Sequence, residues 1–269
     1  MDFFEEMSAA MVRDSARRSI RVDSEVWQKF NSAVSVVPGR KRGTVLADVM
    51  TKNVDRDAKN ERISADSTAK ICRDNAAAET AIKSVLSTDW DGLCKSAMNC
   101  CQCPLAATRQ NVVFGEGCRN ARLMFIGEGP GADEDASGRP FVGAAGQLLD
   151  KMIAAMHLER QDVYIANILK CRPPGNRAPG EEEAAACIGF LQKQIELIKP
   201  EVIVLLGGTA LHFLLKVDGI SRWRGRWLEY ENIAVMPTFH PAFLLRKPEA
   251  KRETWQDLKQ VMARLGITV

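Results

Sequence analysis

The chain has 269 residues, of which 46% are hydrophobic and 26% are charged, and its formal net charge is +3 at pH 7. This composition is typical of a globular protein and excludes a disordered or fibrous one. No apolar stretch approaches the roughly 20 residues that cross a bilayer, and the charge is too small to indicate nucleic-acid binding by itself.

The N-terminal segment and the cysteines indicate a cellular compartment. Residues 1–6 are acidic and lack the apolar stretch of a signal peptide. We therefore expect a cytoplasmic protein with no membrane partner. In that compartment, eight cysteines favour metal ligation over disulfide bonds.

Residues 17–56 predict a small separate module. Ser19–Asp23 alternates polar and apolar residues, as a short strand does. Ser24 and Thr44 can each cap a following helix, and a basic turn around Arg42 would separate the two helices. A unit of this size cannot bury its own apolar side chains, so we expect two copies to pair.

This order of strand, helix, turn and helix resembles a ribbon–helix–helix DNA-binding domain. In that family, two chains pair their strands and the ribbon enters the major groove. The resemblance implies that Arg21 faces the bases, that Arg42 lies at the phosphates, and that the protein is a homodimer through this module. A helical appendage with ordinary surface charge is the alternative. Residues 57–87, rich in alanine and polar residues, predict a linker.

Residues 88–269 predict a larger domain in which strands alternate with helices. This pattern indicates an α/β fold with a parallel four-stranded sheet flanked by helices. Because ligands bind beyond the carboxyl ends of such strands, we expect Glu128, Asn167 and His240 to meet at one edge. The predicted strands are 121–126, 163–166, 202–206 and 233–236, and the predicted helices are 146–156, 181–198, one that begins near 209, and 251–265.

Four cysteines in this domain have a spacing that suits a metal centre. Two residues separate Cys100 from Cys103, which lets two thiolates bind one centre from a single turn. Cys171 follows Cys103 by 68 positions, and Cys187 follows Cys171 by 16. Such a set suits a [4Fe–4S] cluster or a structural zinc, and the spacing does not separate the two. Cys101 is a further candidate.

Four motifs occur in order around these cysteines, and together they carry a family resemblance. They are Gly127–Gly131, Gly138–Gly143, Asn167 and His240–Arg246. With the cysteines, they resemble the family 4 uracil-DNA glycosylases, the iron–sulfur branch of the uracil-DNA glycosylase superfamily. The resemblance implies a DNA repair enzyme that flips uracil out of single- or double-stranded DNA and hydrolyses its N-glycosidic bond. It also implies a [4Fe–4S] cluster bound by Cys100, Cys103, Cys171 and Cys187.

The resemblance assigns a role in base recognition to four residues. Phe141 would stack on uracil, and Gly129 would contact it. The amide of Asn167 offers one donor and one acceptor, which match uracil O4 and N3–H but not the corresponding edge of cytosine. His240 would donate a hydrogen bond to uracil O2 as negative charge develops on the departing base.

Hydrolysis and DNA binding require further groups. A carboxylate would orient the attacking water and stabilise an oxocarbenium-like transition state, and both Glu128 and Glu134 are candidates. Leu244 corresponds to the leucine that family members insert into the minor groove, and Arg246 would contact phosphate. Two other functions compete with this one: a non-catalytic DNA-binding regulator that retains a glycosylase-like domain, and a structural-zinc hydrolase that acts on a nucleotide.

Overall fold

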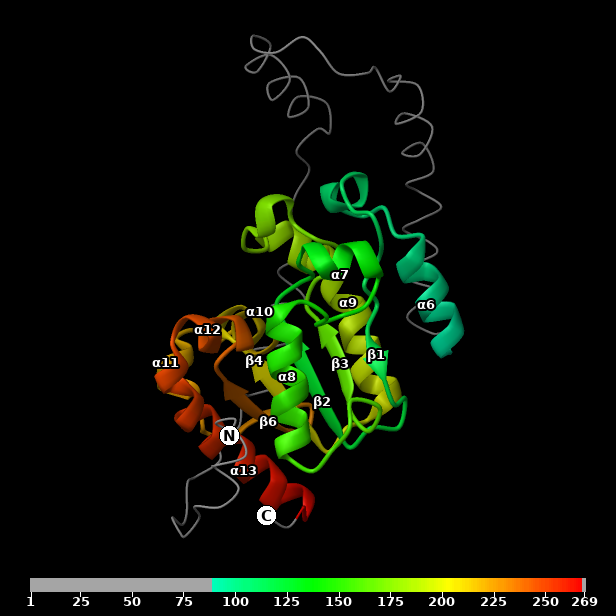
Figure 1. The fold of residues 1–269 in the computed structure, drawn as a ribbon. Helices are drawn as coiled ribbons and strands as arrows, with labels where there is room; N and C mark the ends of the chain where they lie inside the picture. The colour runs from blue at the N-terminus through cyan, green and yellow to red at the C-terminus, as the bar shows by residue number, and fades with distance from the viewer. Residues whose placement is uncertain (1–88, 268–269) are drawn as a thin grey trace, which may run out of the picture. The chain divides into compact units, whose positions relative to one another are not determined.

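The computed structural model describes residues 89–267, which form an α/β domain around one six-stranded sheet (Figure 1). The strand order is β1-β3-β2-β4-β6-β5. The four central strands are parallel, and the edge strands β1 and β5 run antiparallel to their neighbours. The strands are β1 Glu116–Gly117, β2 Leu123–Gly127, β3 Tyr164–Asn167, β4 Val202–Leu206, β5 Leu228–Tyr230 and β6 Ile233–Thr238.

The prediction of a purely parallel, four-stranded sheet is therefore wrong. All four predicted strands are present and parallel to one another, but two antiparallel edge strands extend the sheet to six. The added strands are only two and three residues long. Elements this short do not produce the alternation of apolar and polar residues from which strands are predicted.

Helices cover both faces of the sheet. Alternate strand residues point to opposite faces, and α8 and α13 share one buried cluster with Leu123 and Phe125 of β2. In Figure 1, α8 lies in front of the strands and α9 lies behind them. The predicted helices 181–198 and 251–265 are confirmed at both ends. The helices are α6 Trp90–Met98, α7 Ala132–Ser137, α8 Ala144–Ala155, α9 Glu181–Ile198, α10 Gly208–Leu215, α11 Ile220–Trp223, α12 Pro241–Arg246 and α13 Lys251–Leu265, with 3-10 turns at Pro104–Ala107, Pro174–Asn176 and Pro248–Ala250.

The order of the parallel strands determines where a ligand can bind. The chain passes from β2 to β3 on one side and then crosses to β4 on the other side of β2. In open α/β sheets, the crevice outside the carboxyl ends at such a reversal is the usual ligand site. β2 ends at Gly127, β3 at Asn167 and β6 at Thr238, so the residues that follow share this edge.

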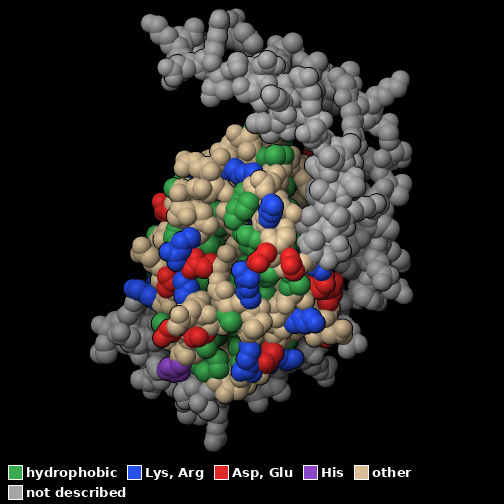
Figure 2. All heavy atoms as spheres, turned by 90° about the vertical axis from the view of Figure 1, so that its right-hand side faces the viewer, with side chains coloured by type: hydrophobic (Ala, Val, Ile, Leu, Met, Phe, Trp, Pro, Cys, Tyr) green, Lys and Arg blue, Asp and Glu red, His purple; other side chains and the backbone are tan. Residues whose placement is uncertain are grey.

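The face shown in Figure 2 carries charges of both signs. Lys and Arg side chains are interspersed there with Asp and Glu side chains, and hydrophobic side chains lie between them. Exposed side chains of opposite charge also form ion pairs on the described domain, such as Arg119–Asp91 (3.3 Å) and Arg122–Glu201 (2.6 Å). Within residues 89–267, none of the helices combines the length and apolarity that crossing a membrane requires.

The predicted ribbon–helix–helix module lies outside the described residues. The same is true of the predicted linker, of Arg21 and Arg42, and of the pairing of two chains that the module implies.

Candidate active site and cysteine cluster

A cleft of about 350 Å³ lies at the carboxyl edge of the parallel strands. The predicted convergence of separate motifs on this edge is confirmed, because one cleft collects residues that follow three different strands. The loop that follows Cys171 adds Pro173 and Asn176 to its lining. The sequence-predicted residues that line the cleft are Glu128, Gly129, Glu134, Phe141, Asn167 and His240.

Gly127 allows two of these side chains to meet at the end of β2. It pairs with Asn167 in the register of β2 and β3. A Cβ atom at residue 127 would lie 2.4 Å from Asn167 Oδ1 and 2.5 Å from the Phe141 ring. Any side chain at this position would therefore displace the amide or the ring, which accounts for a glycine here.

Asn167 presents an unsatisfied acceptor at the cleft. The residue is 2% exposed, and among the described residues its Oδ1 has no hydrogen-bond partner. A buried amide oxygen without a partner is energetically unfavourable, so native structures rarely leave one without a reason. This atom is therefore suited to accept a hydrogen bond from an N–H group of a ligand.

Phe141 and His240 provide the aromatic surface of the cleft. Their ring centroids are 5.6 Å apart, and their planes are inclined by 32°. Phe141 belongs to the loop between α7 and α8, residues 138–143, which we call the Phe141 loop. Its φ of +52° is left-handed, an uncommon conformation for a bulky side chain.

His240 is neutral and has a defined tautomer. Burial and, to a smaller extent, the positive charge of Arg246 lower its pKa to about 4. Its Nδ1 accepts a hydrogen bond from the Ala242 amide (3.1 Å), so the proton of the neutral ring is on Nε2. A neutral imidazole held in this way can donate a hydrogen bond to a developing anion without acting as a strong acid.

The two candidate glutamates have different surroundings. Glu134 Oε1 accepts hydrogen bonds from the amides of Val142 (2.9 Å) and Gly143 (3.0 Å), and Oε2 accepts one from Gly131 (3.0 Å). Both of its oxygens are thus occupied by the backbone. Glu128 lines the same cleft and is hydrogen-bonded through Oε2 to the hydroxyl of Thr209. Glu128 therefore has more capacity to bind a water molecule.

Asp133 also lines the cleft, whereas its neighbour Asp135 points elsewhere. Asp135 is 2% exposed and accepts hydrogen bonds from the amides of Gln110 (2.9 Å) and Asn111 (3.2 Å). It fixes a neighbouring loop and does not face the cleft.

Leu244, the residue predicted to enter the minor groove, points inward in this structure. Leu244 is 0% exposed and belongs to the hydrophobic core with α8 and α13. On α12, Pro241 and Leu244 are three residues apart and face inward, whereas Leu245 is 45% exposed. Leu245 is thus the exposed leucine of this segment. Arg246 ends the same helix and is exposed.

The four predicted cysteine ligands line one small cavity of about 10 Å³. Cys103 caps the 3-10 turn that follows α6, and Cys100 lies three residues before it. Cys171 follows β3 and Cys187 lies on α9, so the cavity joins three separate segments of the chain. Burial raises the pKa of all four thiols, and metal binding would have to release their protons. Cys101 is exposed, and its sulfur lies 3.6 Å from the Asn99 carbonyl oxygen instead of in the cavity.

The four cysteines are the candidate donors of a metal centre. In residues 89–267, no group of three or more His, Cys, Asp or Glu side chains is arranged to hold a single metal ion. The cysteines of a four-iron cluster ligate different iron atoms and so lie further apart than the ligands of one ion. Four cysteine sulfurs around one cavity suit a [4Fe–4S] cluster or a structural zinc.

Two cations next to the cysteines were not predicted from the sequence. Arg109 Nη1 donates to Cys171 Sγ (3.3 Å) and to the Cys100 carbonyl (2.8 Å). Lys170 is 2% exposed, and its Nζ donates to the Asn167 carbonyl (3.0 Å) and to Gln194 Oε1 (2.7 Å). Burial lowers the pKa of Lys170 to about 8. Lys170 directly follows the apolar residues Ile168 and Leu169. A charged residue at that position was the only sequence feature that could have indicated this buried contact.

The chain is similar to known proteins over this domain. A family model described as the Uracil DNA glycosylase superfamily matches residues 114–259. A type-4 uracil-DNA glycosylase of Thermotoga maritima is 50% identical over 170 residues, which cover 60% of this chain and 86% of that protein. One from Archaeoglobus fulgidus is 43% identical over 180 residues, covering 64% and 90%. A type-5 uracil-DNA glycosylase of Pyrobaculum aerophilum is 29% identical over 209 residues, covering 65% and 91%.

Proposed function

The chain belongs to the uracil DNA glycosylase superfamily, and we propose that it is a DNA repair enzyme that excises uracil from DNA and leaves an abasic site. The observation that carries this proposal is the buried, unpartnered Oδ1 of Asn167, which lies beside the Phe141 ring in a cleft that His240 also lines. The substrate is uracil-containing DNA, single- or double-stranded.

Base recognition combines stacking with hydrogen bonds. The flipped base stacks on Phe141, and its N3–H donates to Asn167 Oδ1 while the amide nitrogen donates to O4. Cytosine has an acceptor at N3 and a donor at the 4-position, so it would leave both amide groups without partners. Rejection of the wrong base follows from that loss of hydrogen bonds. Gly129 lines the cleft without a side chain that would compete for the base.

Bond cleavage places negative charge on the departing base and positive charge on the sugar. His240 donates its Nε2 proton in a hydrogen bond to O2, which stabilises the uracil anion. We assign the orientation of the attacking water, and the stabilisation of the oxocarbenium-like sugar, to Glu128. We assign Glu134 to the positioning of the Phe141 loop, because backbone amides occupy its two oxygens.

We assign a [4Fe–4S] cluster to Cys100, Cys103, Cys171 and Cys187. Hydrolysis of a glycosidic bond transfers no electrons, so the contribution of this group is to join the three segments that carry its ligands. Cys171 lies four residues after Asn167, so ligation there also fixes the segment that reads the base. Reduced cysteines able to bind iron fit a cytoplasmic enzyme acting on DNA.

The N-terminal module is proposed on its sequence pattern alone. Residues 17–56 would pair two chains as a ribbon–helix–helix dimer and add DNA contacts through Arg21 and Arg42. Light scattering of the full chain and of a chain lacking residues 1–57 tests this. A monomeric full-length protein at micromolar concentration would overturn it.

Uracil release from labelled oligonucleotides tests the proposed function. The full-length protein, purified without added cofactor, should release uracil from single-stranded and duplex DNA, and Asn167→Asp should lower that activity about ten- to hundredfold. The matched control is Asn176→Asp, because Asn176 also lines the cleft but lies in the loop after Cys171. No release by the wild-type protein with iron bound would favour the non-catalytic regulator.

A further inference from the structure

The Phe141 loop holds its central residue in a conformation that it would not adopt by itself. The left-handed φ of Phe141 is uncommon for a residue with a large side chain and persists only when surrounding contacts hold it. The loop also packs tightly on the start of α8, where a Cβ at Gly146 would lie 1.9 Å from the Phe141 carbonyl oxygen. The groups that hold this loop therefore decide where the Phe141 ring lies.

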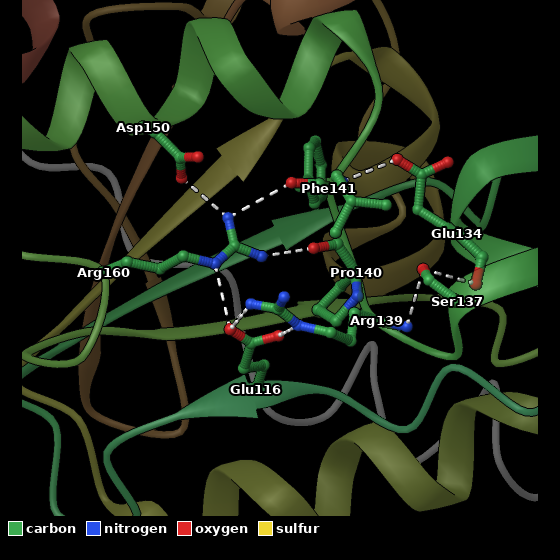
Figure 3. Close-up of polar contacts among 9 residues, drawn as sticks. Glu116, Glu134, Ser137, Arg139, Pro140, Phe141, Asp150 and Arg160 are labelled. Carbon is green, nitrogen blue, oxygen red and sulfur yellow. Dashed lines mark hydrogen bonds and ion pairs between the residues drawn. The ribbon is translucent and has the colours of Figure 1, made fainter.

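Arg160 makes the direct contact with this strained backbone. It lies in the turn between α8 and β3, and its side chain is 19% exposed. Its Nη1 donates to the Phe141 carbonyl (3.2 Å), and its Nη2 donates to the Pro140 carbonyl. Figure 3 shows the guanidinium group on one side of the loop and Glu134 on the other. Two consecutive peptide groups are thus fixed by one planar cation.

Two carboxylates hold Arg160 in place. Asp150 Oδ1 accepts from Nη1 (2.7 Å), and Glu116 Oε1 accepts from Nε (3.1 Å). The planar donors of arginine allow it to bind two carboxylates and two carbonyls at once. Arg139 binds the same Glu116 through two hydrogen bonds of 2.8 Å. Arg139 itself belongs to this loop, but among the described residues its side chain donates only to Glu116, so replacing it removes an ion pair to that glutamate and keeps the two carbonyl contacts of Arg160.

We propose that Arg160 is a positioning residue for base binding. It keeps Phe141 in the left-handed conformation that presents its ring beside Asn167, and through that ring it sets the affinity for the flipped base. The inference rests on the proposed function, because it assumes that the base stacks on Phe141. It assigns no chemical step to Arg160.

Three full-length variants test this role: Arg160→Met, Arg160→Lys and Arg139→Met. Arg160→Met should raise the KM for uracil DNA and the dissociation constant of free uracil about tenfold or more, with a smaller change in kcat. Arg139→Met should leave both within about twofold of wild type, although it removes an ion pair to the same glutamate. Arg160→Lys keeps the charge beside Glu116 but not the planar set of donors, so it should fall between them. If Arg160→Met does not fold, Arg160→Lys is compared with wild type and Arg139→Met instead.

A double variant shows whether Arg160 acts through Phe141. In a Phe141→Ala background, adding Arg160→Met should change uracil affinity by less than twofold, because the ring that Arg160 positions is already gone. A further tenfold loss there, or equal losses in Arg160→Met and Arg139→Met, would overturn the proposal.

Amide hydrogen exchange separates failure of this inference from failure of the proposed function. Val142 and Gly143 amides should exchange faster in Arg160→Met than in wild type and Arg139→Met, whether or not the protein excises uracil. Unchanged exchange would contradict the role of Arg160. Absence of uracil release from wild type and Arg139→Met would instead contradict the proposed function.

Discussion

The two sides of the cleft hold their base-facing side chains by different means. Asn167 begins a segment, residues 167–171, that is buried throughout and tied to its surroundings by strand register, by Lys170 and by a cysteine of the cluster cavity. The Phe141 loop is held by half-exposed ionic side chains, chiefly Arg160 and Glu134. The first arrangement makes base reading part of the folded core. The second leaves stacking dependent on a few surface contacts, so damage there should reduce binding more than stability.

Loss of a cluster ligand should give the largest effect. Cys171→Ser removes a cysteine that joins the segment of Asn167 to the cavity, so we expect lower iron content, lower thermal stability and little activity. Cys101→Ser is the control, because Cys101 is exposed and outside the cavity. Iron analysis and visible absorption of both variants measure the difference. Full iron content in Cys171→Ser would show that the ligand assignment is wrong.

Lys170 tests the same side of the cleft without replacing a ligand, because its backbone N–H, which donates to Cys187 Sγ (3.2 Å), remains in the variant. Lys170→Met leaves the Asn167 carbonyl and Gln194 Oε1 without their buried donor. The free energy of unfolding should fall by about 2–4 kcal/mol, because each hydrogen bond comes from a charged group inside the protein. Lys193→Met, which loses one ion pair to the exposed Glu196, should cost less than about 1 kcal/mol. Equal losses in chemical denaturation would remove the special role of Lys170.

The two glutamates separate chemistry from positioning. Glu128→Gln should lower kcat about a hundredfold with little change in KM, because it removes the charge that orients water. Glu134→Gln should mainly raise KM, about tenfold, because its amide nitrogen would face one of the backbone N–H groups that the carboxylate now accepts. Steady-state kinetics on one uracil oligonucleotide compares them. The reverse pattern would exchange the two assignments.

His240 should produce the smallest effect, a nearly flat pH profile. With a pKa of about 4 the ring stays neutral from pH 8 to pH 6, so kcat should change by less than about twofold from this group. The stability of the protein, unlike kcat, should depend on pH through this residue. As pH falls from about 6.5 toward 4, the unfolded imidazole binds a proton that the folded ring does not, so the free energy of unfolding decreases. His240→Asn should lack that decrease, and an unchanged slope would contradict the buried, neutral ring.

The sequence predicted the parts of this fold that repeat a pattern. The four parallel strands and the full extents of α9 and α13 followed from apolar periodicity. The edge strands were too short to show one. The burial of Leu244 was not predicted, because a short motif does not show the helical period of α12, which turns Leu244 inward and Leu245 outward.

The groups that position the site were mostly beyond sequence reasoning. Arg160 contacts backbone carbonyls 19 and 20 positions away, and such contacts cannot be recognised from residue type or spacing. The occupied oxygens of Glu134 also depend on loop geometry, so the sequence could name two candidate glutamates but not divide their roles. Among the cleft residues, Glu128, Asn167 and His240 were predicted to meet because each follows a strand, whereas Gly129, Glu134 and Phe141 were named by the family resemblance of their motifs.

A crystal structure of the protein with free uracil bound tests the central claim most directly. We expect the base on the Phe141 ring, with N3–H donating to Asn167 Oδ1 and O2 accepting from His240 Nε2, and with the Phe141 backbone still left-handed. Uracil bound elsewhere, or bound in the cleft while Asn167 Oδ1 stays without a partner, would contradict the account.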